Sequence, residues 1–349
     1  MKGAAMACAR MTALALLSAV LLTATPALPC AFHNVLPERT AADWLVEGRA
    51  LVLARPDPEN PFAFAPVEVL RGKVPSDLGA FVDSVSRRRL AAAPENSMLF
   101  ARDGARWVQV AYVDADFRPV MRRILKEGPE WTSGFDARRF ALFAGLQDHR
   151  DRELRNLALR EIDKAPYAEL RRIKLRLGVA ALMENFYTPV NAPYQPIRAL
   201  LLGLEGSEAA RRVIHSTLEA AAHGGQSPTL GAFATALIEI DGAEGVALLE
   251  EKFLADPAQP LAKLELVVEA LAIQHGVGSA ALKGRISAAL QGFVQTRPDG
   301  AALVARQFIS RRDWSQAATL EAMIQAQRFT SSATLLPVAI YVGQAKQAM

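Results

Sequence analysis

Three stretches of this chain begin with a glycine and follow one another at a spacing of 36 residues. They read GSEAARRVIHSTLEAAA at residues 206–222, GAEGVALLEEKFL at residues 242–254 and GSAALKGRISAALQGFV at residues 278–294. After each glycine, apolar residues recur at the spacing of one helical face, so each stretch predicts a helix. One further step of 36 residues reaches Trp314, where the pattern predicts a helix to Gln327. The repeat therefore predicts a series of equivalent helical units.

A second predicted helix lies after each of these helices, at residues 228–240, 261–275, 301–310 and 331–342. A helical hairpin cannot bury its apolar face alone, so neighbouring hairpins stack and share one core, as in an α-solenoid. The alternative is an irregular helical bundle in which the glycine spacing is accidental. If the repeat is real, each glycine lies within a residue or two of a helix start.

The helical pattern begins upstream of the repeat, after Trp131. Residues 151–162, DRELRNLALREI, place Leu154, Leu157 and Ile162 on one face behind a capping acid. This segment resembles the helices of HEAT-type repeats, in which an acid and an arginine accompany a leucine-rich stripe. The resemblance implies that residues 131–349 form a HEAT-like α-solenoid.

The preceding residues, 28–130, predict strands instead of helices. Apolar runs at residues 50–54, 67–70, 98–101 and 107–112 are separated by turn residues, and Asp103-Gly104 between the last two predicts a tight hairpin. The order of these strands resembles the OB-like barrels of netrin-module and tissue-inhibitor-of-metalloproteinase type, over residues 31–115 at most. The disulfides of the animal members are absent here. The expected fold class is α+β and mainly α, with a small OB-like domain before the helical array.

The first 27 residues carry the pattern of a secretory signal peptide. Lys2 and Arg10 are basic, residues 11–22 are apolar, and small residues follow at 25–27. We therefore expect an exported protein, periplasmic or extracellular. No later stretch reaches about 18 continuous apolar residues, so a transmembrane segment is not expected.

Cys30 is the only cysteine after the predicted signal peptide, because Cys8 lies within it. Residues 27–30 are similar to a lipobox, but Pro29 and Ala27 depart from that motif, so a lipid anchor at Cys30 is not the preferred interpretation. Cys30 and His33 together offer a thiolate and an imidazole to a soft metal, which defines the alternative function of a periplasmic metal-handling or redox accessory protein. The preferred interpretation is a small half-buried thiol.

Composition and motifs exclude several function classes. The chain of 349 residues has 51% hydrophobic residues and a net charge of +4 from 40 basic and 36 acidic residues, which argues against nucleic-acid binding. It contains no phosphate-loop, dinucleotide or zinc signature and no nucleophile elbow, so we expect no enzyme, no cofactor and no metal. His215, Glu219 and His223 share a helical face, but one opposite the apolar stripe, and are not assigned to a metal. A hydrolase with dispersed catalytic residues is the remaining class.

The candidate binding residues belong to two segments. The segment at 187–196, YTPVNAPYQP, interrupts the helices with aromatic and proline residues, and such a stiff loop loses little entropy on binding. The competing interpretation is a buried elbow between two parts of the array. The second segment is the densest run of positive charge in the first domain. The candidate partner-binding residues are Tyr187, Tyr194, Arg198, Arg87, Arg88 and Arg89. The expected function is interaction or scaffolding, with the helical array binding another protein of the cell envelope.

Overall fold

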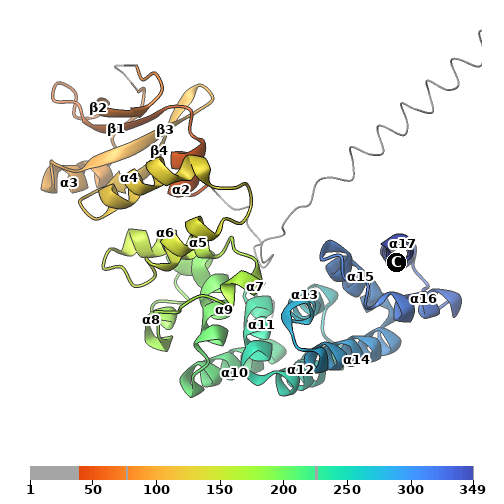
Figure 1. The fold of residues 1–349 in the computed structure, drawn as a ribbon. Helices are drawn as coiled ribbons and strands as arrows, with labels where there is room; N and C mark the ends of the chain where they lie inside the picture. Colours follow the sequence, from red (N-terminus) through yellow and green to blue (C-terminus); the bar gives the residue numbers. More distant parts are fainter. Residues whose placement is uncertain (1–38, 76–77, 225–226, 349) are drawn as a thin grey trace, which may run out of the picture.

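The computed structural model describes residues 39–75, 78–224 and 227–348. The predicted signal peptide, Cys30 and His33 lie outside these residues. The described chain is mainly helical with one small antiparallel sheet. Figure 1 shows the sheet and its covering helices as a head at one end, followed by helices that curve away in an array.

The sheet has four strands in the order β2-β1-β3-β4 within the described part of the chain. The strands are β1 (Leu51–Pro56), β2 (Phe64–Arg71), β3 (Ser97–Asp103) and β4 (Arg106–Val113), and all neighbours are antiparallel. Gly104 joins β3 to β4 at φ +59°, as the Asp103-Gly104 pair predicts, so the hairpin is confirmed. An OB-like barrel has five strands, one more than these residues form.

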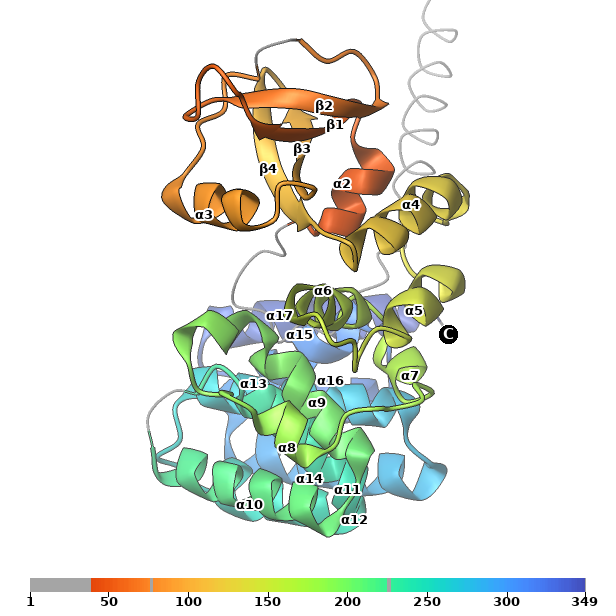
Figure 2. The same cartoon turned by 90° about the vertical axis from the view of Figure 1, so that its left-hand side faces the viewer.

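Helices cover both faces of the sheet. Alternate residues of β1 point to opposite faces, so Val52 packs in a cluster beside α3 (Ser84–Ala92), while Leu51 and Leu53 join a second cluster. The second cluster includes α2 (Ala41–Glu47) and α4 (Phe117–Glu127). Figure 2 shows α3 and α2 on opposite sides of the head. The second cluster continues without interruption into the array, so head and array share one apolar core.

A buried network of ion pairs joins the head to the array. Asp43 of α2 accepts from Arg139 of α5 (Ala137–Ala144) at 2.5 Å and from Lys164 at 2.7 Å. Glu161 of α6 (Arg152–Ile162) has a side chain only 1% exposed and accepts from Arg139 at 2.6 Å and from Lys164 at 2.8 Å. Thr40 also donates its hydroxyl to Glu161. Burial by itself raises the pKa of Asp43, but Lys164 and Arg139 outweigh it and hold that pKa well below its usual value.

The later helices form two packed rows. The first row consists of α9 (Gln195–Glu205), α11 (Leu230–Asp241), α13 (Leu261–Val277), α15 (Ala301–Ser310) and α17 (Ser332–Ala348), each in contact with the next. The second row contains α10 (Glu208–His223), α12 (Ala243–Leu249) with the π-helix η3 (Glu250–Leu254), α14 (Ala280–Thr296) and α16 (Ala317–Gln325). Short helices complete the chain: η1 (Gly128–Glu130), α7 (Tyr167–Leu170), α8 (Val179–Met183), η2 (Pro189–Tyr194) and η4 (Pro298–Gly300).

The three glycines of the repeat all lie between consecutive helices. Gly206 ends α9 and directly precedes the N-cap of α10, Gly242 separates α11 from α12, and Gly278 ends α13 before α14. Gly206 and Gly242 have positive φ, +71° and +57°, whereas Gly278 is extended at φ −75°. The turn positions are therefore equivalent in sequence, but only the first two require the conformational freedom of glycine.

Replacing Gly206 by valine is expected to lower the free energy of unfolding by about 1 kcal/mol or more. The side chain itself has room, because the nearest atom to an added Cβ is the Leu204 carbonyl oxygen at 3.9 Å. Urea denaturation followed by circular dichroism measures the change. Gly206→Asn is the control, since asparagine tolerates the left-handed conformation, and its loss should be clearly smaller. Equal stability of the valine variant and the parent protein would contradict a strained turn.

Candidate functional site

The segment between α8 and α9 presents two apolar side chains to solvent. Tyr187 is 69% exposed and Val190 is 71% exposed, the second of these on η2. The adjacent Phe186 is only 1% exposed, and its ring packs 5.0 Å from that of Tyr187 and 5.8 Å from that of Phe233 on α11. The buried ring thus fixes the loop to the core and places its neighbour on the surface.

Side-chain hydrogen bonds hold this loop in one conformation. Asn191 donates from Nδ2 to the carbonyl oxygen of Asn185 at 2.9 Å and to the hydroxyl of Thr188 at 3.1 Å. Gln195 donates from Nε2 to the carbonyl oxygen of Phe186 at 2.7 Å. Pro189 and Pro193 in η2 restrict the backbone further. The backbone that carries the exposed side chains is therefore held in place before any partner binds, which reduces the entropic cost of binding.

Tyr194 and Arg198, the other two candidate residues of this region, are both half-buried. Tyr194 is half-buried against the apolar core, and this burial raises the pKa of its hydroxyl. Arg198 is half-buried as well and donates to the carbonyl oxygen of Glu184 at 2.9 Å, while burial lowers the pKa of its guanidinium. Each of the two interpretations of this segment therefore applies to one of its tyrosines. Half-buried Tyr194 is part of an elbow that joins α8 to α9, whereas exposed Tyr187 is available for contact with a partner.

The three consecutive arginines of α3 do not form one cationic patch. The guanidinium of Arg87 lies 4.6 Å from the ring centroid of Phe62. Arg88 is exposed and donates to the carbonyl oxygen of Ser84 at 3.3 Å. Arg89 crosses to the array, where it pairs with Glu153 of α6 at 2.6 Å, and its guanidinium lies 3.8 Å from the ring centroid of Tyr112. Of the three arginines, only Arg88 is exposed, whereas Arg87 and Arg89 are half-buried.

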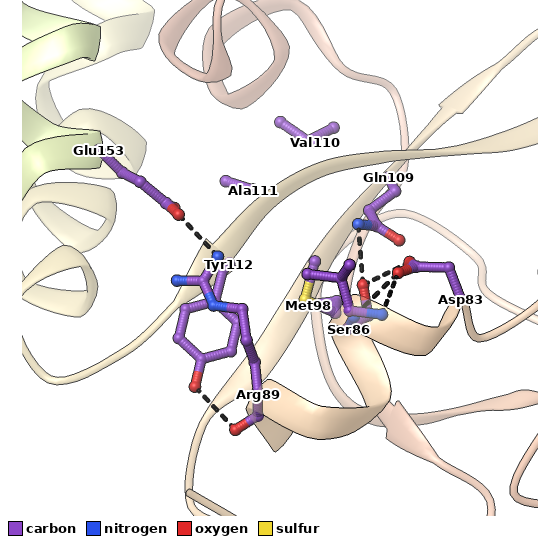
Figure 3. Close-up of a pocket in the computed structure, with 10 residues that line it drawn as sticks. Asp83, Ser86, Arg89, Met98, Gln109, Val110, Ala111, Tyr112 and Glu153 are labelled. Carbon is purple, nitrogen blue, oxygen red and sulfur yellow. Dashed lines mark hydrogen bonds and ion pairs between the residues drawn. The ribbon is translucent and has the colours of Figure 1, made fainter. Parts of the chain in front are cut away.

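A cavity of about 280 Å³ lies between the head and the array (Figure 3). It is lined by residues of α3 and β4 together with Glu153 of α6. One wall is polar, since Gln109 donates to the Ser86 hydroxyl at 3.4 Å and Ser86 donates to Asp83 at 2.6 Å. Figure 3 shows the Arg89 and Glu153 pair closing another side. This cavity could not be predicted from local sequence patterns, because its walls come from segments that are far apart in the chain. Asp83 and Glu153, which both line it, are separated by 70 residues.

The head also exposes an aromatic pair that the sequence analysis did not select. Phe62 and Phe81 are 48% and 69% exposed, and their rings stack with centroids 6.0 Å apart. Phe81 forms an isolated antiparallel bridge with Ala63 outside the four strands, and no strand or helix pattern marks it in the sequence. Exposed aromatic pairs are found from the structure alone, since burial depends on the neighbours that folding supplies.

The histidine face of α10 is engaged in local pairs. His215 contacts Asp241 at 2.6 Å, and Nδ1 of His223 donates to the carbonyl oxygen of Glu219 at 3.0 Å. Over the ranges that the structure describes, no cluster of three or more histidine, cysteine, aspartate or glutamate residues has the arrangement of a metal site. None of the helices in those ranges combines the length and the apolar character needed to cross a bilayer.

Comparison of the chain with family models, curated proteins and solved structures gave no match. Its function must therefore be inferred from its own residues.

Proposed function

We propose that this chain is an exported interaction or scaffolding protein that binds another protein of the cell envelope through its helical array, and that this binding involves no catalytic step. Export is supported by the charged and apolar pattern of residues 1–27. The HEAT-like reading of the array is supported by its two rows of helices, in which each helix of the first row packs on the next. The OB-like reading of the head is supported by its antiparallel strands and hairpin.

The observation that carries this proposal is the ordered, exposed loop that contains Tyr187 and Val190. Tyrosine offers a large amphipathic contact area with few rotatable bonds, and such side chains dominate binding energies at protein interfaces. Because Phe186 and Asn191 already fix the loop, little additional ordering is required when a partner binds. Small-ligand sites are concave and enclose most of the ligand, whereas Tyr187 and Val190 are 69% and 71% exposed, so a protein partner fits this surface better.

Replacing Tyr187 by alanine is expected to weaken partner binding by about 30-fold, which corresponds to about 2 kcal/mol for a central aromatic residue. The measurement is a crosslinking pulldown from intact envelope fractions, with recovery of the partner quantified by mass spectrometry. Phe81→Ala is the matched control, because Phe81 has the same exposed fraction, 69%, but lies on the head. The proposal predicts loss of the partner with the Tyr187 variant alone. Equal recovery of the partner with both variants would show that the loop is not part of the binding surface.

A further inference from the structure

A serine, a histidine and an aspartate from three different segments form a hydrogen-bonded chain in the array. Nδ1 of His275, at the end of α13, lies 2.6 Å from Oδ2 of Asp313. Nε2 of the same imidazole lies 3.3 Å from Oγ of Ser287 on α14. Asp313 lies between α15 and α16, so the chain crosses from one helical hairpin to the next.

The carboxylate of Asp313 sets the tautomer of the imidazole. Burial raises its pKa, but hydrogen bonds from His275 and Ser315 outweigh this effect and lower the pKa to about 2, so the carboxylate is ionised at neutral pH. An ionised carboxylate accepts only, so the neutral imidazole carries its proton on Nδ1. Nε2 is then free to accept the hydroxyl proton of Ser287. This is the arrangement in which a base activates a nucleophile and a third group orients the base.

A fourth side chain supplies a donor beside the same hydroxyl. Nε2 of Gln316 lies 3.1 Å from Oγ of Ser287. Gln316 is only 3% exposed, and its position is braced because its backbone N–H donates to the hydroxyl of Tyr341 at 3.1 Å. An amide N–H that donates to Oγ fixes the rotamer of the hydroxyl and leaves its own proton to be directed toward Nε2 of His275.

The surface of α14 next to Ser287 is open. Side chains on a helix lean toward its N-terminus, so Ser287 leans over the preceding turn. That turn contains Gly284, which is exposed and where an added Cβ would meet no atom within 4 Å. A glycine inside a helix costs about 1 kcal/mol relative to alanine, and here it gains no packing in return. Because position 284 carries no side chain, residue 284 does not cover the partly exposed Ser287.

From this geometry we propose that Ser287 is an activated nucleophile for acyl transfer, with His275 as its general base and with Asp313 and Gln316 as positioning residues. The substrate class is a carboxylic ester. Oγ bonds to the carbonyl carbon as its proton passes to Nε2 of His275, and the bond to the alcohol oxygen then breaks as that proton passes to the leaving alkoxide. Water attacks the acyl-serine by the same route and releases the acid.

This proposal goes beyond the binding role of the Tyr187 loop and opposes the expectation of a chain without catalysis. The test is reaction of the full mature chain with a fluorophosphonate, which phosphonylates activated serines with loss of fluoride. Intact-mass and peptide mass spectrometry are expected to show one adduct on Ser287. Absence of an adduct, or an adduct on other residues only, would overturn the proposal and leave the four side chains as a structural network.

Variants of the chain separate reactivity from folding. Ser287→Ala is expected to lose the adduct, and His275→Gln is expected to lower the labelling rate by about 100-fold or more. Gly284→Trp is expected to block labelling by covering the approach to Ser287. Gly343→Trp is its matched control, because Gly343 is also an exposed position inside a helix with no atom within 4 Å of an added Cβ. Labelling that is equal in the two tryptophan variants would contradict the access route, and labelling that survives in Ser287→Ala would contradict the nucleophile. None of these changes touches the Tyr187 loop, so failure of this proposal leaves the binding proposal unaffected.

Discussion

Replacing Glu161 by alanine is expected to lower the free energy of unfolding by about 3–5 kcal/mol, because it leaves a buried arginine without one of its two carboxylate partners. The side chain of Arg139 is 19% exposed and pairs with Glu161 and Asp43, while that of Glu161 is 1% exposed. Removing Glu161 leaves part of the desolvation cost of Arg139 uncompensated, because only Asp43 then pairs with it. Chemical denaturation of the parent protein and the variant measures the difference.

The control for this change is an exposed ion pair elsewhere in the chain. Glu127 pairs with Arg123 at 2.9 Å on α4, and the two side chains are 36% and 54% exposed, so Glu127→Gln is expected to cost less than about 1 kcal/mol, the usual limit for such pairs. The double variant Glu161→Leu with Arg139→Met should recover part of the loss, since it removes both buried charges together. A change of similar size for Glu161→Ala and Glu127→Gln would show that the network between head and array contributes little to stability.

Replacing Gly203 by valine is expected to lower the free energy of unfolding by about 3 kcal/mol, because it inserts a side chain where two helices touch. An added Cβ at Gly203 on α9 would lie 2.7 Å from Cα of Ala236 on α11. That neighbour is backbone, so no side-chain rotation relieves the contact, and the two helices must move apart.

The matched control is Gly343→Ala, at an open position inside α17. Alanine there should stabilise the protein by about 1 kcal/mol, since it improves helix propensity without a clash. Urea denaturation of both variants gives the comparison. If the valine at position 203 proves neutral or stabilising, α9 and α11 do not pack closely and the first row of the array is not continuous.

The helices of the array could be predicted from sequence because their signals are local. Residues 301–310 match α15 at both ends, and the glycine positions mark the turns correctly. The predicted helix ends are wrong where contacts made in the folded chain override the local sequence pattern. The helix expected from Trp314 begins only at Ala317, since Asp313 bonds the backbone N–H of Ser315 in a turn, and the last helix continues past Val342 to Ala348.

The head illustrates what sequence reasoning could have found and did not. The region was expected to be β-rich, yet it contains α2, α3 and α4 beside the strands. Thr40 and Asp43 form a capping box at the start of α2, and Asp83 caps α3, so both helices carried a readable N-terminal signal. The three consecutive arginines were interpreted only as a run of positive charge, and the helix α3 that carries them was not predicted.

The sites depend on contacts that no local pattern contains. Ser287, His275 and Asp313 meet only because neighbouring hairpins stack, and their spacing in sequence matches no common nucleophile motif. The pairing of Arg89 with Glu153 likewise requires the head to lie on α6. The aromatic loop could be selected from its composition, but only the structure separates exposed Tyr187 from half-buried Tyr194.

Site-specific photo-crosslinking at position 187 tests the binding function most directly. A photoreactive phenylalanine analogue replaces Tyr187 in the full chain, and a second protein carries it at Phe81, which is equally exposed at 69%. After irradiation of intact envelope, we expect one discrete crosslinked protein band from position 187 and none of that mass from position 81. No band from position 187, or the same band from both positions, would contradict binding through the helical array.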